Sequence, residues 1–416
     1  MATRPGMQRV VITGMGVASP LGCSLDEFWA RLLAGDSGVR LLPEIDLTPC
    51  PTKIGAAVSG LDENAYFSHK ERKRLSRSTL LGLVAADQAV EAAGGNLAKG
   101  DGHRRGVIMG SSIAGYTAAE PFFEEYFTGW RGSPYIIPKV MNNAPASNIS
   151  IRHGFIGPLL TTDAACASAA HAVGYAFQQV RHGILDMALT GAADVALSPA
   201  VMQAWSLLRV LSERNETPKQ ACRPFSGDRD GLVLGEGAGV LLLESESSAR
   251  GRAAQIYGEV LGYGATSDGH HITQPSVSGP REAMRLAIED AGLQVEQIDY
   301  VNAHATGTQA NDGNESTAIK QVLGEHAYKI PVVGIKGAIG HSIAASGALE
   351  LISTVLSIRD GKVPPTINLT TPDPECDLDY VGEGQRAVDV RYALSNSFAF
   401  GGSNAALVVG RYEERG

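Results

Sequence analysis

Short apolar runs alternate along the chain with longer segments in which apolar residues return every three or four positions. A short apolar run is typical of a buried strand, and the longer period is typical of a helix with one apolar face. The pattern predicts strands at Arg9–Thr13, Gly106–Met109, Met187–Thr190, Val240–Leu243, Tyr300–Ala303, Val332–Ile335 and Ala406–Val409, and helices at Leu80–Ala93, Ser168–His182, Pro280–Gly292, Asn314–Leu323 and Ser346–Arg359. Because strands and helices alternate, we expect an α/β fold in which helices cover sheets.

The chain also contains a faint internal repeat. Thr161–Phe177 and Val332–Ile352 share one design, in which a strand, a loop with a reactive side chain, small residues and a helix follow one another. A duplicated α/β unit explains the similarity, although loops of small residues also match one another by chance. We therefore predict two halves, residues 1–255 and residues 256–416, with the seam near Ser245–Ile256.

Composition narrows the classes of protein. The chain has 416 residues, of which 44% are hydrophobic and 19% charged, so it is globular and long enough for a large core. The formal net charge of −9 argues weakly against a nucleic-acid partner. No apolar run is long enough to span a membrane, and residues 1–16 lack the apolar core of a signal peptide. The five cysteines are scattered, which favours free thiols over disulfides or a zinc site. We expect a cytoplasmic enzyme without a metal site and with neither nucleic acid nor membrane as partner.

One of these cysteines stands out by its surroundings. Cys166 lies in Leu160–Gly174, where polar residues lead into the thiol and small residues follow it. This pattern places a thiol where a strand turns into a helix, and the N–H groups of the helix N-terminus favour thiolate over thiol. The alternative is a buried cysteine that acts as a small hydrophobic residue, as most free cysteines do. On this segment alone the two interpretations are evenly balanced.

Two downstream segments favour the nucleophile. His304 follows a predicted strand and precedes a turn, a position that commonly faces an active-site crevice. Lys336 and His341 flank a short run of mostly small residues in the second segment. Glu350 lies among apolar residues of the next helix, where a carboxylate is either on a polar face or buried and paired, and we favour burial near Lys336 or a cation. One thiol, two imidazoles and one ammonium at strand-to-helix turns suit thiol catalysis on a thioester.

A last candidate segment is rich in glycine and phenylalanine. Ser395–Asn404 contains Phe398 and Phe400, followed by Gly401 and Gly402. The glycines permit positive φ angles and motion. The segment is either an ordinary turn over core aromatic residues, or it supplies an N–H group for an oxyanion and a gate over a pocket.

Ordered motifs along nearly the whole chain resemble one family. They are Val10–Gly22, the sequence around Cys166, Arg223–Gly239, Asn302–Thr308, Ile335–His341 and Asn396–Asn404. The chain resembles the elongating β-ketoacyl-acyl-carrier-protein synthases of type II, which belong to the thiolase superfamily. The resemblance implies a thiolase-like five-layered αβαβα fold of two duplicated mixed-sheet halves, usually assembled as a dimer.

The resemblance also implies roles for twelve residues. It makes Cys166 the acyl-accepting nucleophile, and it makes His304 and His341 the pair that binds the malonyl thioester and promotes decarboxylation, with Lys336 as their support. Phe400 is the gate and donates to the oxyanion together with Cys166, and Phe398 is its neighbour in the gate. The other implied roles are contacts of the phosphopantetheine arm for Thr306 and Thr308, the lining of the acyl tunnel for Ile113 and Trp205, and acidic support of the His/Lys network for Glu315 and Glu350. It implies no tightly bound cofactor, substrates carried on the phosphopantetheine of an acyl carrier protein, and a structural monovalent cation.

The sequence departs from the family pattern in places. Ala399 stands between the two phenylalanines where glycine is usual, and the lysine segment Ile335–His341 lacks two common hydroxyls. Other stretches look more like ketosynthases of polyketide and nodulation-factor pathways, so a specialised acyl substrate is plausible. Three alternatives stay open: a self-paired 3-oxoacyl synthase, a type II polyketide ketosynthase that needs a chain-length factor as partner, and a non-catalytic chain-length subunit. The presence of Cys166, His304 and His341 argues against the last one.

Overall fold

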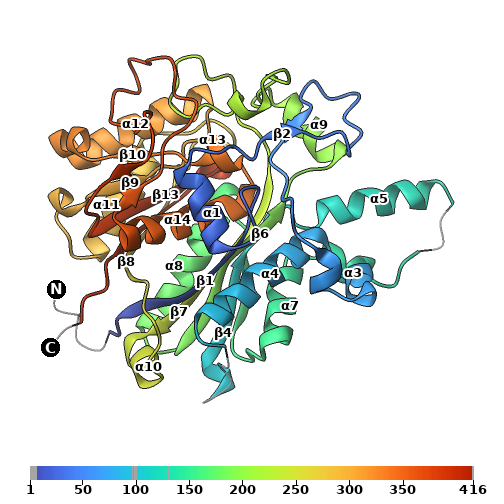
Figure 1. Ribbon diagram of the computed structural model, residues 1–416, viewed down its shortest axis with the longest axis horizontal. Helices are drawn as coiled ribbons and strands as arrows, with labels where there is room; N and C mark the ends of the chain where they lie inside the picture. The colour runs from blue at the N-terminus through green and yellow to red at the C-terminus, as the bar shows by residue number, and fades with distance from the viewer. Residues whose placement is uncertain (1–6, 96, 98–100, 130–131, 415–416) are drawn as a thin grey trace.

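The protein is built around one ten-stranded mixed sheet (Figure 1). The computed structural model describes residues 7–95, 97, 101–129 and 132–414, so residues 1–6, which belong to the segment expected to lack a signal peptide, lie outside the described residues. The strands of the sheet are β1 (Val10–Ala18), β4 (Arg105–Gly110), β5 (Leu159–Thr162), β6 (Met187–Val195), β7 (Glu236–Ser245), β8 (Gly258–Ser267), β9 (Tyr300–Asn302), β10 (Val332–Val333), β13 (Tyr392–Phe398) and β14 (Ser403–Gly410).

The sheet consists of two five-stranded parts with the same topology. From the centre outward, one part has the order β1-β7-β6-β4-β5 and the other has β8-β14-β13-β9-β10. In each part the first two pairings are antiparallel and the next two are parallel. The two parts join through an antiparallel pairing of Val10–Ile12 with Gly258–Val260. The identical order of pairings confirms that the fold contains a duplicated mixed-sheet unit.

Helices complete five layers. The helices α4 (Arg77–Ala92) and α7 (Ala144–His153) cover the outer face of the first part, and α11 (Ser278–Asp290) and α12 (Gln309–Leu323) flank the second part. Between the two parts lie α8 (Ser168–Arg181) and α14 (Ser346–Asp360), which pack against each other and against strands of both parts (Figure 1). The first half of α8 is rich in small residues, with Ala169, Ala170, Ala172 and Gly174, which lets backbones approach closely there. The predicted five-layered αβαβα fold is confirmed.

The remaining elements decorate this framework. They are α1 (Leu25–Leu33), β2 (Arg40–Leu41), β3 (Ile54–Gly55), α2 (Glu63–Tyr66), α3 (His69–Arg74), α5 (Tyr116–Phe127), α6 (Ile136–Val140), α9 (Pro199–Leu207), α10 (Glu246–Gly251), α13 (Lys336–Ile339), β11 (Lys362–Val363) and β12 (Arg386–Ala387). The helix α5 projects sideways from the body (Figure 1). Among the described residues, none of the helices combines the length and apolar character needed to cross a membrane.

All twelve predicted elements overlap an observed strand or helix of the predicted type. Three strands of the sheet went unpredicted, and their sequences explain why. Glycine interrupts the apolar alternation of β8, polar residues fill the centre of β13, and β5 spans only Leu159–Thr162 at the edge of the sheet. Pairing with neighbours, rather than local pattern, determines such strands.

The fold positions the first candidate loop through a close backbone approach. A Cβ atom at Gly110, the last residue of β4, would lie 2.6 Å from the carbonyl carbon of Ser168 at the start of α8. Only glycine therefore allows the N-terminus of α8, and the Cys166 turn that precedes it, to sit against the end of β4.

We predict that Gly110→Ala lowers the free energy of unfolding by about 2 kcal/mol, because the added methyl group overpacks this contact. Gly251→Ala is the matched control, since a Cβ atom there meets nothing within 4 Å. Denaturant unfolding of both variants checks the prediction. Equal stability of Gly110→Ala and the parent protein would contradict it.

Candidate active site

Cys166 sits on a sharp turn between β5 and α8. It is the middle residue of the 3-10 turn Ala165–Ala167, and only 5% of its surface is exposed. Ala165 adopts a left-handed conformation with φ of 47°, which is rare for a residue with a Cβ atom. The Ser168 hydroxyl holds the turn: it accepts the N–H of Ala164 at 2.9 Å and donates to the carbonyl of Ala165 at 2.7 Å. Strain of this kind, held by surrounding bonds, is typical of functional sites.

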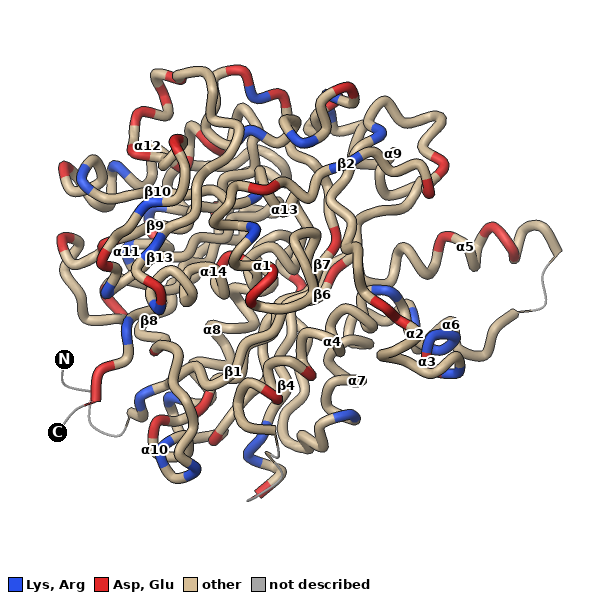
Figure 2. The backbone as a smooth tube through the Cα atoms, viewed as in Figure 1, with Lys and Arg blue, Asp and Glu red and all other residues tan. Residues whose placement is uncertain are grey.

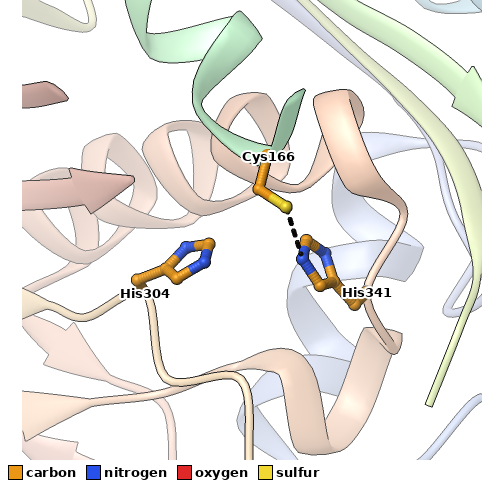
Figure 3. A group of neighbouring side chains, drawn as sticks. All are labelled: Cys166, His304 and His341. Atoms are coloured by element: carbon orange, nitrogen blue, oxygen red, sulfur yellow. Dashed lines mark hydrogen bonds between the residues drawn. The ribbon is translucent and has the colours of Figure 1, made fainter. Parts of the chain in front are cut away.

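The two predicted histidines meet the thiol. Figure 3 shows the Cys166 side chain pointing toward the imidazoles of His304 and His341, which come from separate loops. The Cys166 Sγ lies 3.1 Å from the Nε2 of His341. The rings of His304 and His341 lie edge to face with centroids 5.6 Å apart. Residues separated by more than a hundred positions therefore converge on one point.

Lys336 fixes the tautomer of His304. The Lys336 Nζ lies 3.2 Å from the His304 Nδ1, and it also donates to the His304 carbonyl and to the Glu350 carboxylate. An ammonium group is only a donor, so Nδ1 must be the acceptor and the His304 proton must reside on Nε2. The structure thus aims an N–H donor of His304 at the pocket.

The charges behind the histidines are fully buried. Lys336 and Glu350 form an ion pair with no exposed surface on either side chain. Burial raises the pKa of Glu350, and the neighbouring Lys336 opposes that rise. Glu315 accepts the backbone N–H groups of His304 and Ala305, each at 2.8 Å. Burial raises the pKa of Glu315 to about 7 despite these bonds. Both carboxylates therefore orient the His304 loop and lie away from solvent.

The electrostatics keep the imidazoles and the thiol neutral. Burial lowers the pKa of His304 well below its ordinary value, and Lys336 and His341 lower it further. The pKa of His341 is lowered by burial and by Lys336 in the same way. Burial raises the pKa of the Cys166 thiol to about 12, although Lys336 and backbone N–H groups pull it down. The expected thiolate is thus opposed by desolvation, so the thiol needs a base when substrate binds, and the His341 Nε2 is the one in contact.

The phenylalanine segment closes over the thiol. The backbone N–H groups of Cys166 and Phe400 both lower the pKa of the thiol, so both lie where they can also face a developing oxyanion. The Phe400 ring stacks on Trp205 with centroids 5.5 Å apart and 16° between the planes. Phe398 is buried and contacts the His304 ring edge to face at 6.0 Å. Phe400 therefore covers the thiol side of the site and Phe398 the His304 side.

One cavity of about 250 Å³ gathers most of the predicted residues. Its lining includes Cys166, His304, His341, Thr306, Thr308, Trp205, Phe398 and Phe400. The Thr306 and Thr308 hydroxyls lie 2.8 Å apart, and Thr308 also caps α12 by accepting the N–H of Asn311 at 3.3 Å. Ile113 does not line this cavity but packs against the apolar cluster that contains Cys166.

Asp194 is a residue of this site that sequence reasoning missed. It is fully buried at the end of β6 and accepts the N–H groups of Ser112 and Ala344 at 3.3 Å and that of Ile113 at 3.2 Å. Burial raises its pKa to about 7. Asp194 thereby ties together the loops on either side of the thiol. An aspartate within the otherwise apolar and glycine-containing strand Met187–Val195 was the signal that could have found it.

Two buried oxygens fit the cation that the family resemblance implies. Asn302 Oδ1 and Glu350 Oε2 lack a hydrogen-bond partner among the described residues, while the Asn302 amide donates to the Glu350 carbonyl at 3.0 Å. Buried oxygens without partners are the ligands that a hard cation prefers. A bound monovalent ion would add positive charge beside the Lys336–Glu350 pair.

The thiol and the two imidazoles also form a ligand set. The ligand atoms of Cys166, His304 and His341 lie within 4.8 Å of one another. Sulfur and imidazole nitrogen are ligands that Zn²⁺ accepts. A zinc ion held there would occupy the atoms that perform thiol chemistry and would compete with substrate.

Comparison with known sequences identifies the family. Residues 7–249 match the profile of "Beta-ketoacyl synthase, N-terminal domain" and residues 257–370 that of "Beta-ketoacyl synthase, C-terminal domain". The 3-oxoacyl-[acyl-carrier-protein] synthase 2 of Synechocystis sp. is 40% identical over 412 residues, covering 98% of this chain and 99% of the relative. Nodulation protein E of Rhizobium meliloti is 40% identical over 402 residues, covering 96% and 98%.

Solved structures agree. The ishigamide ketosynthase/chain length factor superposes with a TM-score of 0.91 at 35% identity, covering 98% of this chain and 100% of the other. A ketosynthase solved with its type II polyketide acyl-carrier protein gives 0.90 at 32% identity, with the same coverage. The fold and the site define a condensing enzyme with the thiolase fold. The chain belongs to the β-ketoacyl synthase family, as the sequence motifs indicated, and is an acyltransferase.

We predict that Lys336→Met moves the acid limb of malonyl-thioester decarboxylation to higher pH. Lys336 lowers the pKa of His304, so removal of Lys336 raises that pKa. The His304 imidazole then becomes protonated at a less acidic pH, and the neutral form that the reaction needs is lost there. The rate at the optimum should also fall about a hundredfold, because the tautomer is no longer fixed. Decarboxylation rates between about pH 5 and pH 8 check this.

Two further variants make the result interpretable. Lys320→Met removes a lysine whose ion pair with Asp377 lies at the surface, and it should leave the profile unchanged. Lys336→Met alone leaves the Glu350 carboxylate buried without a partner, which can impair folding. The double variant Lys336→Met/Glu350→Gln removes that unpaired charge. An unshifted acid limb in both Lys336 variants would contradict the assignment.

Proposed function

We propose that this protein is a 3-oxoacyl-[acyl-carrier-protein] synthase that extends a Cys166-bound acyl chain by decarboxylative condensation with a malonyl group on an acyl carrier protein. The Synechocystis relative carries the name of this activity, and one structural neighbour is a ketosynthase in complex with its acyl-carrier protein. The reaction has two halves, and the residues of the pocket have a role in each.

In the first half the acyl chain moves from its carrier to the enzyme. The Cys166 thiol gives its proton to the Nε2 of His341 and attacks the acyl thioester carbonyl. The N–H groups of Cys166 and Phe400 donate to the oxygen of the tetrahedral intermediate. The bond from the carbonyl carbon to the carrier sulfur breaks, and the carrier thiolate takes the proton from His341. The products are acyl-Cys166 and free carrier thiol.

In the second half a malonyl thioester loses CO₂. Once Cys166 is acylated, its sulfur no longer donates to the His341 Nε2, so the neutral His341 ring exchanges to the tautomer with its proton on Nε2. The malonyl carbonyl oxygen accepts the Nε2 N–H groups of His304 and His341, and the electrons of the breaking carbon–carboxylate bond form an enolate whose charge these neutral donors hold. The enolate carbon attacks acyl-Cys166, and the carbon–sulfur bond to Cys166 breaks. The 3-oxoacyl thioester leaves, and the thiolate is reprotonated from solvent. Thr306 and Thr308 lie in the same cavity and offer hydroxyls to the pantetheine arm.

One observation carries this proposal. The Cys166 sulfur, the His341 Nε2 and the N–H of His304 face one cavity, with a buried ammonium that dictates the His304 tautomer. A protease-type thiol needs one histidine and an orienting side chain, whereas two neutral imidazole donors suit the enolate oxygen of a decarboxylating malonyl thioester. A non-catalytic chain-length subunit would have no use for this arrangement.

We predict acylation at a single thiol. Incubation with acyl-carrier protein should add one acyl mass to the intact protein, and Cys166→Ala should abolish the addition. Cys222→Ala is the matched control, because burial raises the pKa of both thiols to about 12. His304→Ala should still be acylated but should lose condensation by about a thousandfold. Acyl mass on Cys166→Ala, or full condensation by His304→Ala, would refute the mechanism.

We also infer that the enzyme acts as a dimer. The strand β5 ends the sheet, and its Leu159 and Leu160 are 38% and 40% exposed. Tyr126 and Phe127 at the end of α5 are also exposed, and Figure 1 shows α5 projecting from the body. An uncovered edge strand with apolar neighbours is a template for pairing with another chain. The partner is either a second copy or a chain-length-factor-like subunit, and one structural neighbour is named as a ketosynthase/chain length factor.

We favour the homodimer, because this chain has a complete set of catalytic groups. We predict that the purified chain alone sediments as a dimer and that Leu160→Lys shifts it to monomer, since a charge would be buried at the edge. Tyr328→Lys, at a position that is 47% exposed on the turn that packs against α12 in the other half of the fold, should leave the dimer intact. An inactive monomer as the parent form would instead support the obligate heterodimer.

The proposal assigns the pathway only as fatty acid or polyketide biosynthesis. Relatives of equal identity are named for 3-oxoacyl synthesis and for nodulation, so the chain extends acyl groups of fatty acid or polyketide type. The five free cysteines favour a reducing compartment, and we place the enzyme in the cytoplasm.

A further inference from the structure

A row of hydrogen-bonded side chains lies beside the thiol turn and has no part in the reaction described above. His171 of α8 is half-buried, and both of its ring nitrogens have a partner. The Nδ1 lies 2.6 Å from the hydroxyl of Tyr263 on β8, and the Nε2 lies 2.9 Å from the hydroxyl of Ser403 at the start of β14. One imidazole thus connects the central helix to two strands of the second half of the sheet.

The helix is shaped to admit Tyr263. A Cβ atom at Gly174, one turn after His171, would lie 2.4 Å from two atoms of the Tyr263 ring, so the close approach requires glycine there. The rings of His171 and Tyr263 lie edge to face with centroids 6.1 Å apart. The Tyr263 N–H donates to Asp290, which pairs with Arg181 at the end of the same helix. Tyr263 is therefore fixed against α8 and holds the His171 ring in one orientation.

Ser403, at the other end of this row, adjoins the turn that carries Phe400. Residues 399–402 form the turn of the β13–β14 hairpin, and the Ala399 N–H donates to the Ser403 carbonyl at 2.9 Å where the hairpin closes. The two glycines with left-handed angles directly precede Ser403, whose backbone already pairs with β8. Ser403 is thus the residue at which the glycine turn meets the fixed sheet.

His171 and Cys166 belong to one rigid element. Cys166 lies in the turn that leads into α8, and His171 lies in the first turn of that helix. Residues 168–180 carry no charge, and Figure 2 shows α8 in tan over most of its length. The helix packs against α14 and against strands of both halves. A bond from Ser403 to α8 therefore fixes the Phe400 turn relative to the thiol.

We propose that His171 is a positioning residue for the gate, because its bond to Ser403 holds the Phe400 turn closed over Cys166. The inference rests on the proposed acylation of Cys166, in which the Phe400 N–H donates to the oxyanion. A neutral imidazole has one donor and one acceptor nitrogen, and a hydroxyl takes either role, so both bonds form in either tautomer. Without the bond to Ser403, the turn leaves the thiol more often and the donor is in place less often.

Paired substitutions test this link. Glutamine places its amide nitrogen near the position of the imidazole Nε2, and asparagine places it near Nδ1. His171→Gln therefore keeps a donor for Ser403, whereas His171→Asn keeps only the contact with Tyr263. Ser403→Ala cuts the same link from the other side. Two rates are measured for each variant: alkylation of Cys166 by N-ethylmaleimide, located by peptide mass, and acylation of Cys166 by acyl-carrier protein, followed by intact mass.

The two rates should move in opposite directions. We expect His171→Asn and Ser403→Ala to raise the alkylation rate of Cys166 about fivefold and to lower its acylation rate by a similar factor, the effect of one hydrogen bond. His171→Gln should return both rates to near those of the parent protein. The double variant His171→Asn/Ser403→Ala should differ no more than either single variant, because both remove one interaction.

Controls separate an open gate from a loosened fold. Cys222 is fully buried and should stay unreactive, since its alkylation would report general loosening. If His171→Asn exposes Cys222, Ser403→Ala alone decides the result. His182→Asn, which changes an exposed histidine just after α8, should leave both rates unchanged.

Two results would overturn the proposal: unchanged alkylation of Cys166 in Ser403→Ala, or alkylation that rises as much in His171→Gln as in His171→Asn. Alkylation does not require condensing activity, so it decides this proposal even where no acyl group is transferred. Absence of an acyl adduct on the parent protein would instead refute the proposed function.

Discussion

The site depends on one ammonium group that is wholly withdrawn from water. Lys336 pairs with Glu350 and donates to both the Nδ1 and the carbonyl of His304. Burying a charge without partners is strongly unfavourable, so these bonds are what keep the ammonium in place. In return, its charge lowers the pKa of both imidazoles and opposes the desolvation of the Cys166 thiol. The rest of the pocket can use neutral imidazole donors because this cation stands behind them.

The duplicated fold explains how such distant residues meet. The central helices α8 and α14 occupy matching places in the two halves, and the 3-10 turns that precede them contact each other. The turns are built alike: Ala165 and Ile343 both have φ of 47°, and the hydroxyls of Ser168 and Ser346 each accept a nearby backbone N–H at 2.9 Å. One copy of the turn carries Cys166 at its middle position. The other copy follows His341 and has Ala344 at that position, so a symmetric framework holds different side chains in its two halves.

Local sequence predicted the repeat, the alternation of elements and the residues that converge in the pocket, because Cys166, Lys336 and His341 each stand among small residues. It did not predict Asp194, whose role arises only when loops from β4 and from the second half meet at the end of β6. It also anticipated a thiolate from the helix N-terminus at Cys166, whereas the pKa is governed by desolvation, which depends on how completely other segments cover the sulfur. The burial of Glu350 beside Lys336 was expected from its apolar neighbours on the helix, and the structure confirms it.

The backbone angles of the proposed gate segment determine whether Ala399 causes strain there. Ala399 replaces a glycine that is usual in the family, yet its backbone is extended, with φ of −136° and ψ of 157°. Any residue adopts that conformation, so the methyl group causes no strain where the gate is closed. The left-handed angles belong to Gly401 and Gly402, with φ of 82° and 72°. Glycine moves between left-handed and right-handed backbone conformations more freely than other residues do. The backbone freedom next to Phe400, whose ring stacks on Trp205, therefore lies at Gly401 and Gly402 rather than at Ala399. In the described conformation Ala399 thus causes no strain, and the φ angles that favour glycine lie at Gly401 and Gly402.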